Sequence, residues 1–255
     1  MKRKTVLKIM SVVFAAVFIV AGYNIVKNLG ENAKADNLYE TLQNEFVTKL
    51  EETPTNEEQP QEVKEPAITV DFNALCKKNS EVVGWLYLPN TPINYPVVQA
   101  EDNDKYLHLD LNGKQLSAGT MFMDFRNNPQ GEDTNYIIYG HHMKNGTMLS
   151  AIVKYKSQSF YDEHPVVYYF TPQQKYKVEL FAGCLIGYDD EMYDSSLTLD
   201  DPTALVAEYK KNSTFKSDVT VTPEDTLLTL STCTYEYDDA RYVVMGKLTE
   251  LTEEE

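Results

Sequence analysis

The chain has 255 residues, of which 42% are hydrophobic and 24% charged, a composition typical of a folded protein with one sizeable domain. Its formal net charge is −16, and the first 27 residues hold five basic side chains and no acidic one, so the rest is more acidic still. An acidic body repels phosphate backbones, which excludes nucleic acid as an expected partner.

A basic tip and an apolar run open the chain. Residues 9–26 read IMSVVFAAVFIVAGYNIV, 18 positions without a charge, which is near the lower limit for a helix that spans a bilayer. Because basic residues precede this run and mostly acidic ones follow it, residues 1–27 are predicted to be a cytoplasmic tip and a single transmembrane anchor. The alternative is a cleaved signal peptide, since residues 33–35 read Ala-Lys-Ala, but that site lies seven residues beyond the run.

Residues 28–66 are predicted to form a helical stalk and a linker. Leu38, Leu42, Phe46 and Leu50 recur every four residues, which predicts a helix over 36–50 with Asp36 as its N-cap. Residues 51–66, EETPTNEEQPQEVKEP, contain three prolines and many acids, as in an extended tether. The folded domain is therefore expected over residues 67–255.

The expected domain is mainly β. A short helix capped by Asp71 should end at Lys78, and two further helical segments are predicted near 148–156 and over Pro202–Asn212. Many short strands with irregular spacing favour a closed barrel or a sandwich. The predicted strands cover 84–88, 120–123, 136–139, 166–170, 176–186, 226–232 and 242–248.

Three cysteines at wide spacing, Cys76, Cys184 and Cys233, form neither a disulfide framework nor a zinc-binding pattern. A bridge between Cys76 and Cys184 would still leave Cys233 free. Acidic residues crowd the segment 189–201, but they lack the alternating spacing of a calcium loop, so we expect a solvated loop and no metal site.

Three side chains at predicted strand ends could carry out catalysis. Cys233 ends the run TLLTLSTC, where a rigid backbone can direct a nucleophile. His141 and His142 follow another strand and Gly140, and an imidazole there can reach a thiol on a neighbouring strand. Arg241 opens the last strand, and a turn would bring its guanidinium back towards Cys233 to stabilise an oxyanion.

Together these motifs resemble the class B sortases. The resemblance is carried by TLSTC followed by Arg241, by YGHH with its downstream Gly and Met, and by the stretches NSEVVGWLYLPNTPINYPVVQAEDNDKYLHLD and AGTMFMDFRN. It covers roughly residues 70–250, including an insertion that holds the Pro202–Asn212 helix.

The resemblance implies an eight-stranded β-barrel with an N-terminal helix, a helix in the insertion before the last strands, and a preceding transmembrane helix. It assigns Cys233 as nucleophile, His141 as the catalytic histidine, with His142 as the alternative, and Arg241 as the third catalytic residue. The acidic residue that can follow the nucleophile in this family is absent, since Thr234 and Tyr235 stand there. The substrate-binding positions that it implies are Asn103, Leu107, Ser231 and Tyr193.

The implied activity is that of a cysteine transpeptidase. It would cleave a C-terminal sorting signal, Asn-Pro-x-Thr or a related peptide, through a thioester on Cys233, and no cofactor is implied. Its partners would be a surface protein that bears the signal and an amine of a peptidoglycan precursor or a pilin. Its place would be the Gram-positive cell membrane, with the catalytic domain outside. Two other interpretations stay open: a catalytically silent, wall-facing binding module and a thiol peptidase in which water replaces the amine.

Overall fold

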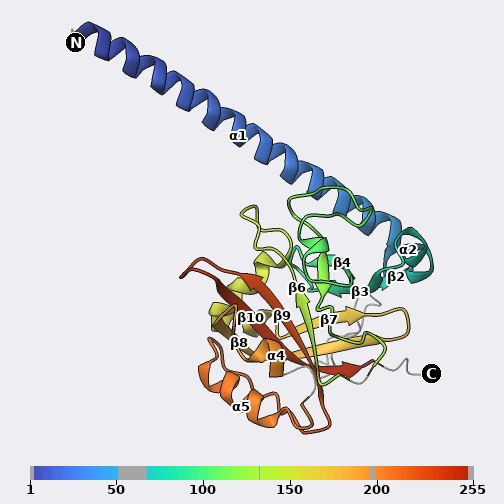
Figure 1. The fold of residues 1–255 in the computed structure, drawn as a ribbon. Helices are drawn as coiled ribbons and strands as arrows, with labels where there is room; N and C mark the ends of the chain where they lie inside the picture. Colours follow the sequence, from blue (N-terminus) through green and yellow to red (C-terminus); the bar gives the residue numbers. More distant parts are fainter. Residues whose placement is uncertain (1–2, 51–67, 132, 196–198, 252–255) are drawn as a thin grey trace, which may run out of the picture.

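The computed structural model describes residues 3–50, 68–131, 133–195 and 199–251. One long helix, α1 (Arg3–Phe46), projects from a β-barrel (Figure 1). The sequence predicted two helices with Asp36 as the cap of the second, and this is wrong, because Asp36 lies inside the single helix. The connecting residues contain no proline, and a lone Gly30 costs only about 1 kcal/mol in a helix, so α1 continues through them.

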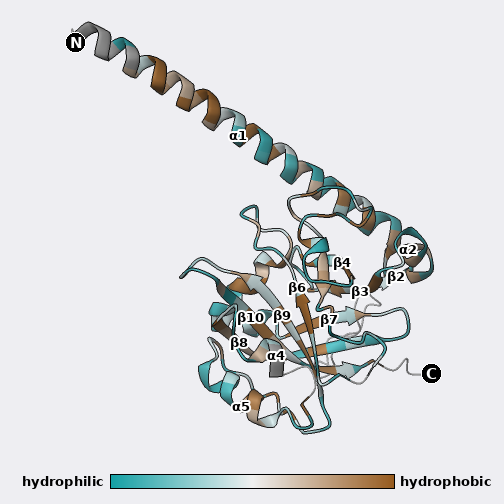
Figure 2. Ribbon diagram, in the orientation of Figure 1, coloured by the Kyte–Doolittle hydropathy of each residue, from teal (hydrophilic) through white to brown (hydrophobic). Residues whose placement is uncertain are grey.

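The two parts of α1 differ in what surrounds them. Between Met10 and Leu29 the apolar side chains are exposed, and Figure 2 shows this part of the helix standing clear of the barrel. By length and composition α1 is a candidate membrane span. Further along, four side chains are buried against the barrel: Ala35, Tyr39, Leu42 and Phe46. The predicted stripe thus ends at Phe46, since Leu50 is 44% exposed.

A two-stranded sheet follows α1. The strand β1 (Val47–Lys49) pairs antiparallel with β2 (Ile68–Val70), and the predicted tether over residues 51–66 lies outside the described residues. The next helix, α2 (Phe72–Lys78), begins as predicted, because the Asp71 carboxylate accepts a hydrogen bond of 3.0 Å from the Ala74 amide. The end of α1 is therefore tied to the residues that lead into the barrel.

Eight strands close the barrel in the order β10-β8-β7-β3-β4-β5-β6-β9, which confirms the predicted eight-stranded fold. Neighbours are antiparallel except for the pairs β4–β5 and β6–β9, which are parallel. The strand β4 was not predicted, because its run NYPVV contains Pro96, which argues against a central strand. The barrel strands are β3 (Val82–Tyr87), β4 (Asn94–Val98), β5 (Met121–Met123), β6 (Asn135–Tyr139), β7 (Val166–Phe170), β8 (Lys175–Gly187), β9 (Thr226–Cys233) and β10 (Ala240–Glu250).

Helical segments lie between the strands. The predicted helix of the insertion is α5, which begins just after Pro202 and packs on β8. The segment near 148–156 forms a 3₁₀ helix, η2. The helices are η1 (Lys105–Leu107), η2 (Leu149–Lys156), α3 (Gln158–Glu163), α4 (Met192–Ser195) and α5 (Thr203–Asn212).

Apolar side chains form two clusters, one around Trp85 with the packed part of α1, and a smaller one between the outer face of the sheet and α5. The bridge considered between Cys76 and Cys184 does not form, because all three cysteines are free. The reason is their location: Cys76 lies on α2 against the first cluster, whereas Cys184 on β8 belongs to the second. Burial raises the pKa of Cys184 to about 12, so its thiol stays protonated at neutral pH.

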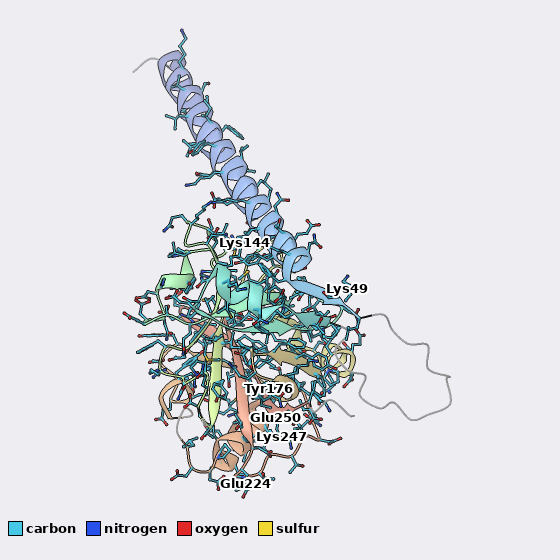
Figure 3. All side chains as sticks on the ribbon, turned by 90° about the vertical axis from the view of Figure 1, so that its right-hand side faces the viewer. Lys49, Lys144, Tyr176, Glu224, Lys247 and Glu250 are labelled. Atoms are coloured by element: carbon cyan, nitrogen blue, oxygen red, sulfur yellow. The ribbon has the colours of Figure 1, made fainter. Side chains whose placement is uncertain are left out.

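The two ends of the barrel are distinguished by α1. In Figure 3, Lys144, in the loop that follows His142, lies at the end from which α1 projects, and Glu224 lies at the opposite end. The loop after β6 is therefore on the side of the barrel nearer to the candidate membrane span.

Candidate active site

Strand pairing brings the predicted nucleophile and its partners to one end of the barrel. Cys233 and Arg241 are directly opposite each other in the antiparallel pair of β9 and β10, so their side chains share one face of the sheet. On the other side of β9, Tyr139 of the parallel strand β6 pairs with Ser231. The Gly140 amide continues this pairing with a 3.2 Å hydrogen bond to the Ser231 carbonyl, which places His141 level with Cys233.

The imidazole of His141 is oriented by the backbone of η1. Its Nε2 lies 2.8 Å from the Leu107 carbonyl oxygen, and because a carbonyl can only accept, Nε2 carries the proton. The ring also stacks on His108, with centroids 5.9 Å apart. This arrangement leaves Nδ1 of His141 as the nitrogen that can gain and lose a proton.

The imidazole of His142 makes different contacts. Its Nδ1 donates to the Cys233 carbonyl oxygen at 3.0 Å, and its ring lies 5.3 Å from that of Tyr235. Among the described residues, His141 lines the cleft at Cys233, and His142 does not. The geometry favours His141 over His142 as the histidine that can act on a substrate.

The cleft has a volume of about 580 Å³ and is lined by all seven of the side chains that were assigned as catalytic or substrate-binding, with His141 taken as the histidine. Three of them are the predicted catalytic residues, and four are the predicted substrate-binding residues. The cleft is open to solvent on one side, and Cys233 is only partly buried. The lining comprises Asn103, Asp104, Leu107, Phe122, Arg126, Tyr139, Gly140, His141, Tyr188, Asp189, Asp190, Tyr193, Ser231, Thr232, Cys233 and Arg241.

The insertion supplies one wall of the cleft. Tyr193, on α4, forms a 2.7 Å hydrogen bond between its hydroxyl and that of Ser231, two residues before Cys233. Burial raises the pKa of Tyr193 to about 12, although the Ser231 hydrogen bond and the charge of Arg241 act in the opposite direction. The tyrosine is therefore a neutral hydrogen-bonding group beside the thiol.

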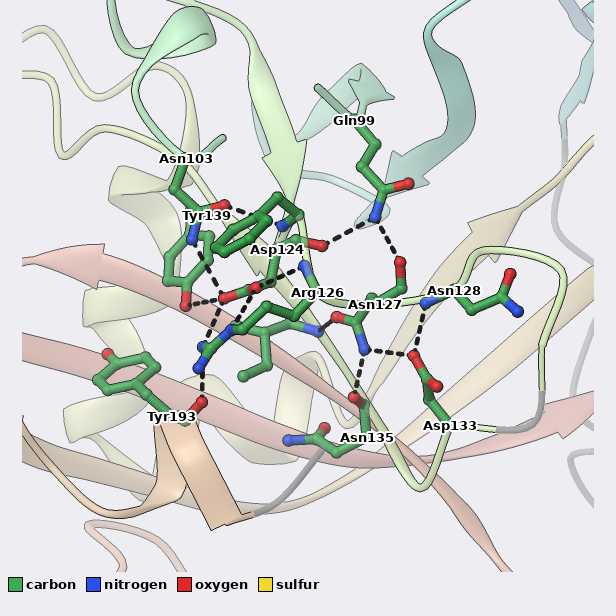
Figure 4. A network of polar contacts seen from close by, with 12 residues as sticks. Gln99, Asn103, Asp124, Arg126, Asn127, Asn128, Asp133, Asn135, Tyr139 and Tyr193 are labelled. Atoms are coloured by element: carbon green, nitrogen blue, oxygen red, sulfur yellow. Dashed lines mark hydrogen bonds and ion pairs between the residues drawn. The ribbon is translucent and has the colours of Figure 1, made fainter. Parts of the chain in front are cut away.

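Sequence reasoning missed a polar network behind the opposite wall (Figure 4). Asp124 is fully buried and accepts hydrogen bonds from Arg126, Asn103 and the Tyr139 hydroxyl. Burial alone would raise the pKa of Asp124, but the hydrogen bonds from Arg126 and Tyr139 outweigh it and hold the pKa below its ordinary value. The run AGTMFMDFRN contains Asp124 and Arg126, but nothing in its pattern indicated that Asp124 is buried and that Arg126 lines the cleft.

The loop after Cys233 has a carboxylate that the family resemblance did not place. Glu236 is bonded to Lys156 and to the Thr234 hydroxyl, and these contacts lower its pKa to about 2. Glu236 is therefore ionised and already paired, two positions beyond Thr234. In the described part of the chain, no group of three or more His, Cys, Asp or Glu residues could hold a metal ion.

Comparisons with known proteins agree with this geometry. A family model for the sortase domain matches residues 86–249. The chain is 32% identical to sortase B of Staphylococcus aureus over 251 residues, covering 97% of this chain and 98% of that one. It is 33% identical to sortase B of Listeria monocytogenes over 255 residues, covering 97% and 99%.

A solved structure gives the same result in three dimensions. The Staphylococcus aureus sortase B–substrate complex matches with a TM-score of 0.66 at 35% identity, over 71% of this chain and 85% of that one. A sortase B has also been solved in complex with triglycine, and it matches at 34% identity with the same TM-score. The chain belongs to the sortase family and is a class B sortase.

Proposed function

We propose that this transpeptidase cleaves a C-terminal sorting signal of the Asn-Pro-x-Thr type and joins the new carboxyl end to an amine of a peptidoglycan precursor or a pilin. The observation that carries the proposal is the meeting of Cys233, His141 and Arg241 at one open cleft. The matches to sortase B structures solved with a substrate and with triglycine support a peptide as acyl donor and an amine as acceptor.

The first half-reaction forms a thioester. The Cys233 thiol gives its proton to Nδ1 of His141 as its sulfur attacks the carbonyl carbon of the scissile peptide bond, and the resulting oxyanion lies within the reach of Arg241, its cross-strand neighbour. When the C–N bond breaks, the leaving amine needs a proton, which Nδ1 of His141 provides. The Leu107 carbonyl accepts a hydrogen bond from Nε2 of the same ring, which fixes the orientation of the imidazole and therefore the position of Nδ1.

The second half-reaction transfers the acyl group. An acceptor amine attacks the thioester, gives a proton to Nδ1 of His141, and forms a new peptide bond while the Cys233 thiolate leaves. Water in place of the amine would release a free acid instead. The acceptor therefore decides whether the product is a joined protein or a hydrolysed one.

Four side chains of the cleft are proposed to bind the sorting peptide. Asn103 and Leu107 lie on the η1 side, and Ser231 and Tyr193 lie on the side of β9 and the insertion. An extended peptide between them would have its scissile carbonyl at Cys233. The polar groups could bind the peptide backbone, and Leu107 could contact an apolar side chain.

The proposed location is the cell membrane, with a single span and the barrel outside. The exposed apolar part of α1 and the excess of basic residues before it support this topology. Full-length protein should then resist carbonate extraction, and a protease added to protoplasts should release the barrel. A mature N-terminus at Asp36 would instead indicate secretion after cleavage.

The activity is tested with a pentapeptide library in the presence and absence of triglycine, followed by mass analysis of the products. Transfer predicts a peptide extended by triglycine, whereas hydrolysis alone would make the protein a thiol peptidase. A silent binding module predicts no product and slow labelling of all three cysteines by a methanethiosulfonate reagent. An active sortase predicts rapid labelling at Cys233, which lines the open cleft, because Cys184 is buried and burial raises the pKa of the Cys76 thiol.

A further inference from the structure

A single buried carboxylate connects the two sides of the cleft. The Asp124 side chain is fully inaccessible to solvent, and both of its oxygens are hydrogen-bonded. One oxygen accepts from Nε of Arg126 at 2.9 Å and from the Arg126 amide at 3.0 Å. The other accepts from Nη2 of Arg126 at 2.9 Å, from Nδ2 of Asn103 at 3.2 Å and from the Tyr139 hydroxyl at 2.9 Å. The pair of Asp124 and Arg126 is thus bidentate, a geometry that fixes orientation as well as distance.

An ion pair between a buried carboxylate and a partly exposed guanidinium contributes little net stability, because desolvation of the buried charge offsets the attraction. Its effect on geometry is larger. Removing the carboxylate would take away the bidentate partner of Arg126, whose side chain is 32% exposed. The role of Asp124 is therefore better inferred from the side chains that it orients than from its contribution to the free energy of unfolding.

On one side, Asp124 fixes the amide of Asn103. The Nδ2 group donates to Asp124, and the Oδ1 atom accepts a 3.0 Å hydrogen bond from the Phe125 amide. The two hydrogen bonds therefore fix which end of the Asn103 amide is nitrogen and which is oxygen, and the amide plane cannot flip without losing both. A primary amide has a second N–H and a second lone pair on its oxygen. Asn103 therefore keeps one donor and one acceptor with which to hydrogen-bond to a peptide in the cleft.

On the other side, Asp124 acts through Arg126. Nη2 of Arg126 donates to the Tyr193 carbonyl oxygen at 2.7 Å, which ties the short helix α4 of the insertion to the barrel (Figure 4). Tyr193 in turn forms its hydroxyl contact with Ser231. Among the described residues, Tyr193 is thus hydrogen-bonded to the barrel side of the cleft through its carbonyl and its hydroxyl, and the carbonyl contact depends on the guanidinium that Asp124 orients.

We propose that Asp124 is a positioning residue that sets the spacing of the substrate cleft by holding Asn103 directly and Tyr193 through Arg126. It does not touch the reacting atoms. The role in peptide binding rests on the function proposed above, whereas the joint ordering of the two walls does not.

The test compares Asp124→Asn with Asp133→Asn in full-length protein in detergent. Asp133 is the matched control, because it is another carboxylate of the same network, where it accepts from Asn127 and Asn128, but it does not contact Asn103 or Arg126. An asparagine at 124 keeps the volume but cannot accept from all of its present donors. Loss of hydrogen bonds to a charged group predicts a KM for the sorting peptide that rises about tenfold or more, with kcat close to wild type.

Two further readouts separate positioning from general loss of structure. Hydrogen exchange should become faster in both walls at once, over residues 101–107 and 190–195, in Asp124→Asn but not in Asp133→Asn. In an Asn103→Ala background, Asp124→Asn should raise KM less than it does in wild type, because part of its effect then has no route to the peptide. If Asp124→Asn does not fold, Arg126→Lys replaces it. That variant keeps the charge, loses the planar fork and should raise KM and the exchange rate of residues 190–195.

The proposal is overturned if KM rises no more in Asp124→Asn than in Asp133→Asn, or if exchange changes in neither wall or in only one. It is likewise overturned if the effects of Asp124→Asn and Asn103→Ala multiply fully. If wild-type protein converts no peptide of the library, the proposed function fails. The exchange measurement still decides in that case whether Asp124 holds the two walls together.

Discussion

The packing of α1 against the barrel can be tested with Leu42→Ala. Leu42 is 1% exposed and belongs to the main apolar cluster. Truncation of a buried leucine to alanine costs about 2–5 kcal/mol, the lost transfer free energy plus the cavity left behind. The higher helix propensity of alanine offsets only roughly a few tenths of a kcal/mol of this loss. For a domain of this size, the expected fall in Tm is roughly 4–20 °C.

Leu50→Ala is the matched control, since the four-residue periodicity assigned both leucines the same role. Leu50 is 44% exposed and lies beyond α1, so its truncation should change the free energy of unfolding by less than about 0.5 kcal/mol. Urea denaturation followed by tryptophan fluorescence measures both, because Trp85 lies in the same cluster as Leu42. Equal effects of the two substitutions would refute the packing of α1 on the barrel.

Three further predictions concern the cleft. Arg241→Lys keeps the charge but loses the planar fork, so kcat/KM should fall about 10²-fold, and near-wild-type activity would show that Arg241 acts only as a general charge. Gly119→Ala should destabilise by at least about 1–2 kcal/mol and lower kcat. The reason is that Gly119 has a φ of 57° and an added Cβ would lie 2.6 Å from the Leu107 carbonyl oxygen that orients His141. Gly113→Ala, with a φ of 74° and nothing within 4 Å, should lower stability but leave kcat unchanged. Because the pKa of Asp124 is lower in the folded protein, its ionised carboxylate stabilises the fold above the ordinary carboxyl pKa of about 3.9, and this contribution is lost as the pH falls through the lower, folded-state pKa. The difference in free energy of unfolding between wild type and Asp124→Asn should therefore narrow below about pH 4.

Local patterns in the sequence predicted the strands that carry the proposed catalytic side chains. Alternation in TLLTLSTC and RYVVMGKL placed Cys233 at the end of one strand and Arg241 at the start of the next, and the structure pairs them directly. The position of His141 after Gly140 was also local information. These elements could be predicted because each depends on neighbours within a few residues.

What could not be predicted depends on contacts between distant residues. The burial of Tyr39 follows from a barrel surface that includes Gly119, whose carbonyl accepts a hydrogen bond from the Tyr39 hydroxyl. Asp124 contacts Asn103 and Arg126 reaches Tyr193, separations of 21 and 67 residues. A buried aspartate and a surface aspartate have the same letter in a sequence, so only the fold could distinguish them.

The most direct test of the central claim is the mass of the acyl-enzyme. Full-length protein is mixed with an Asn-Pro-x-Thr peptide, quenched before turnover is complete, digested and mapped. The acyl group should be found on the fragment that contains Cys233, should disappear when triglycine is added, and should be absent from Cys233→Ala. An acyl group on Cys76 or Cys184, or turnover that persists in Cys233→Ala, would contradict the assignment of Cys233 as the nucleophile.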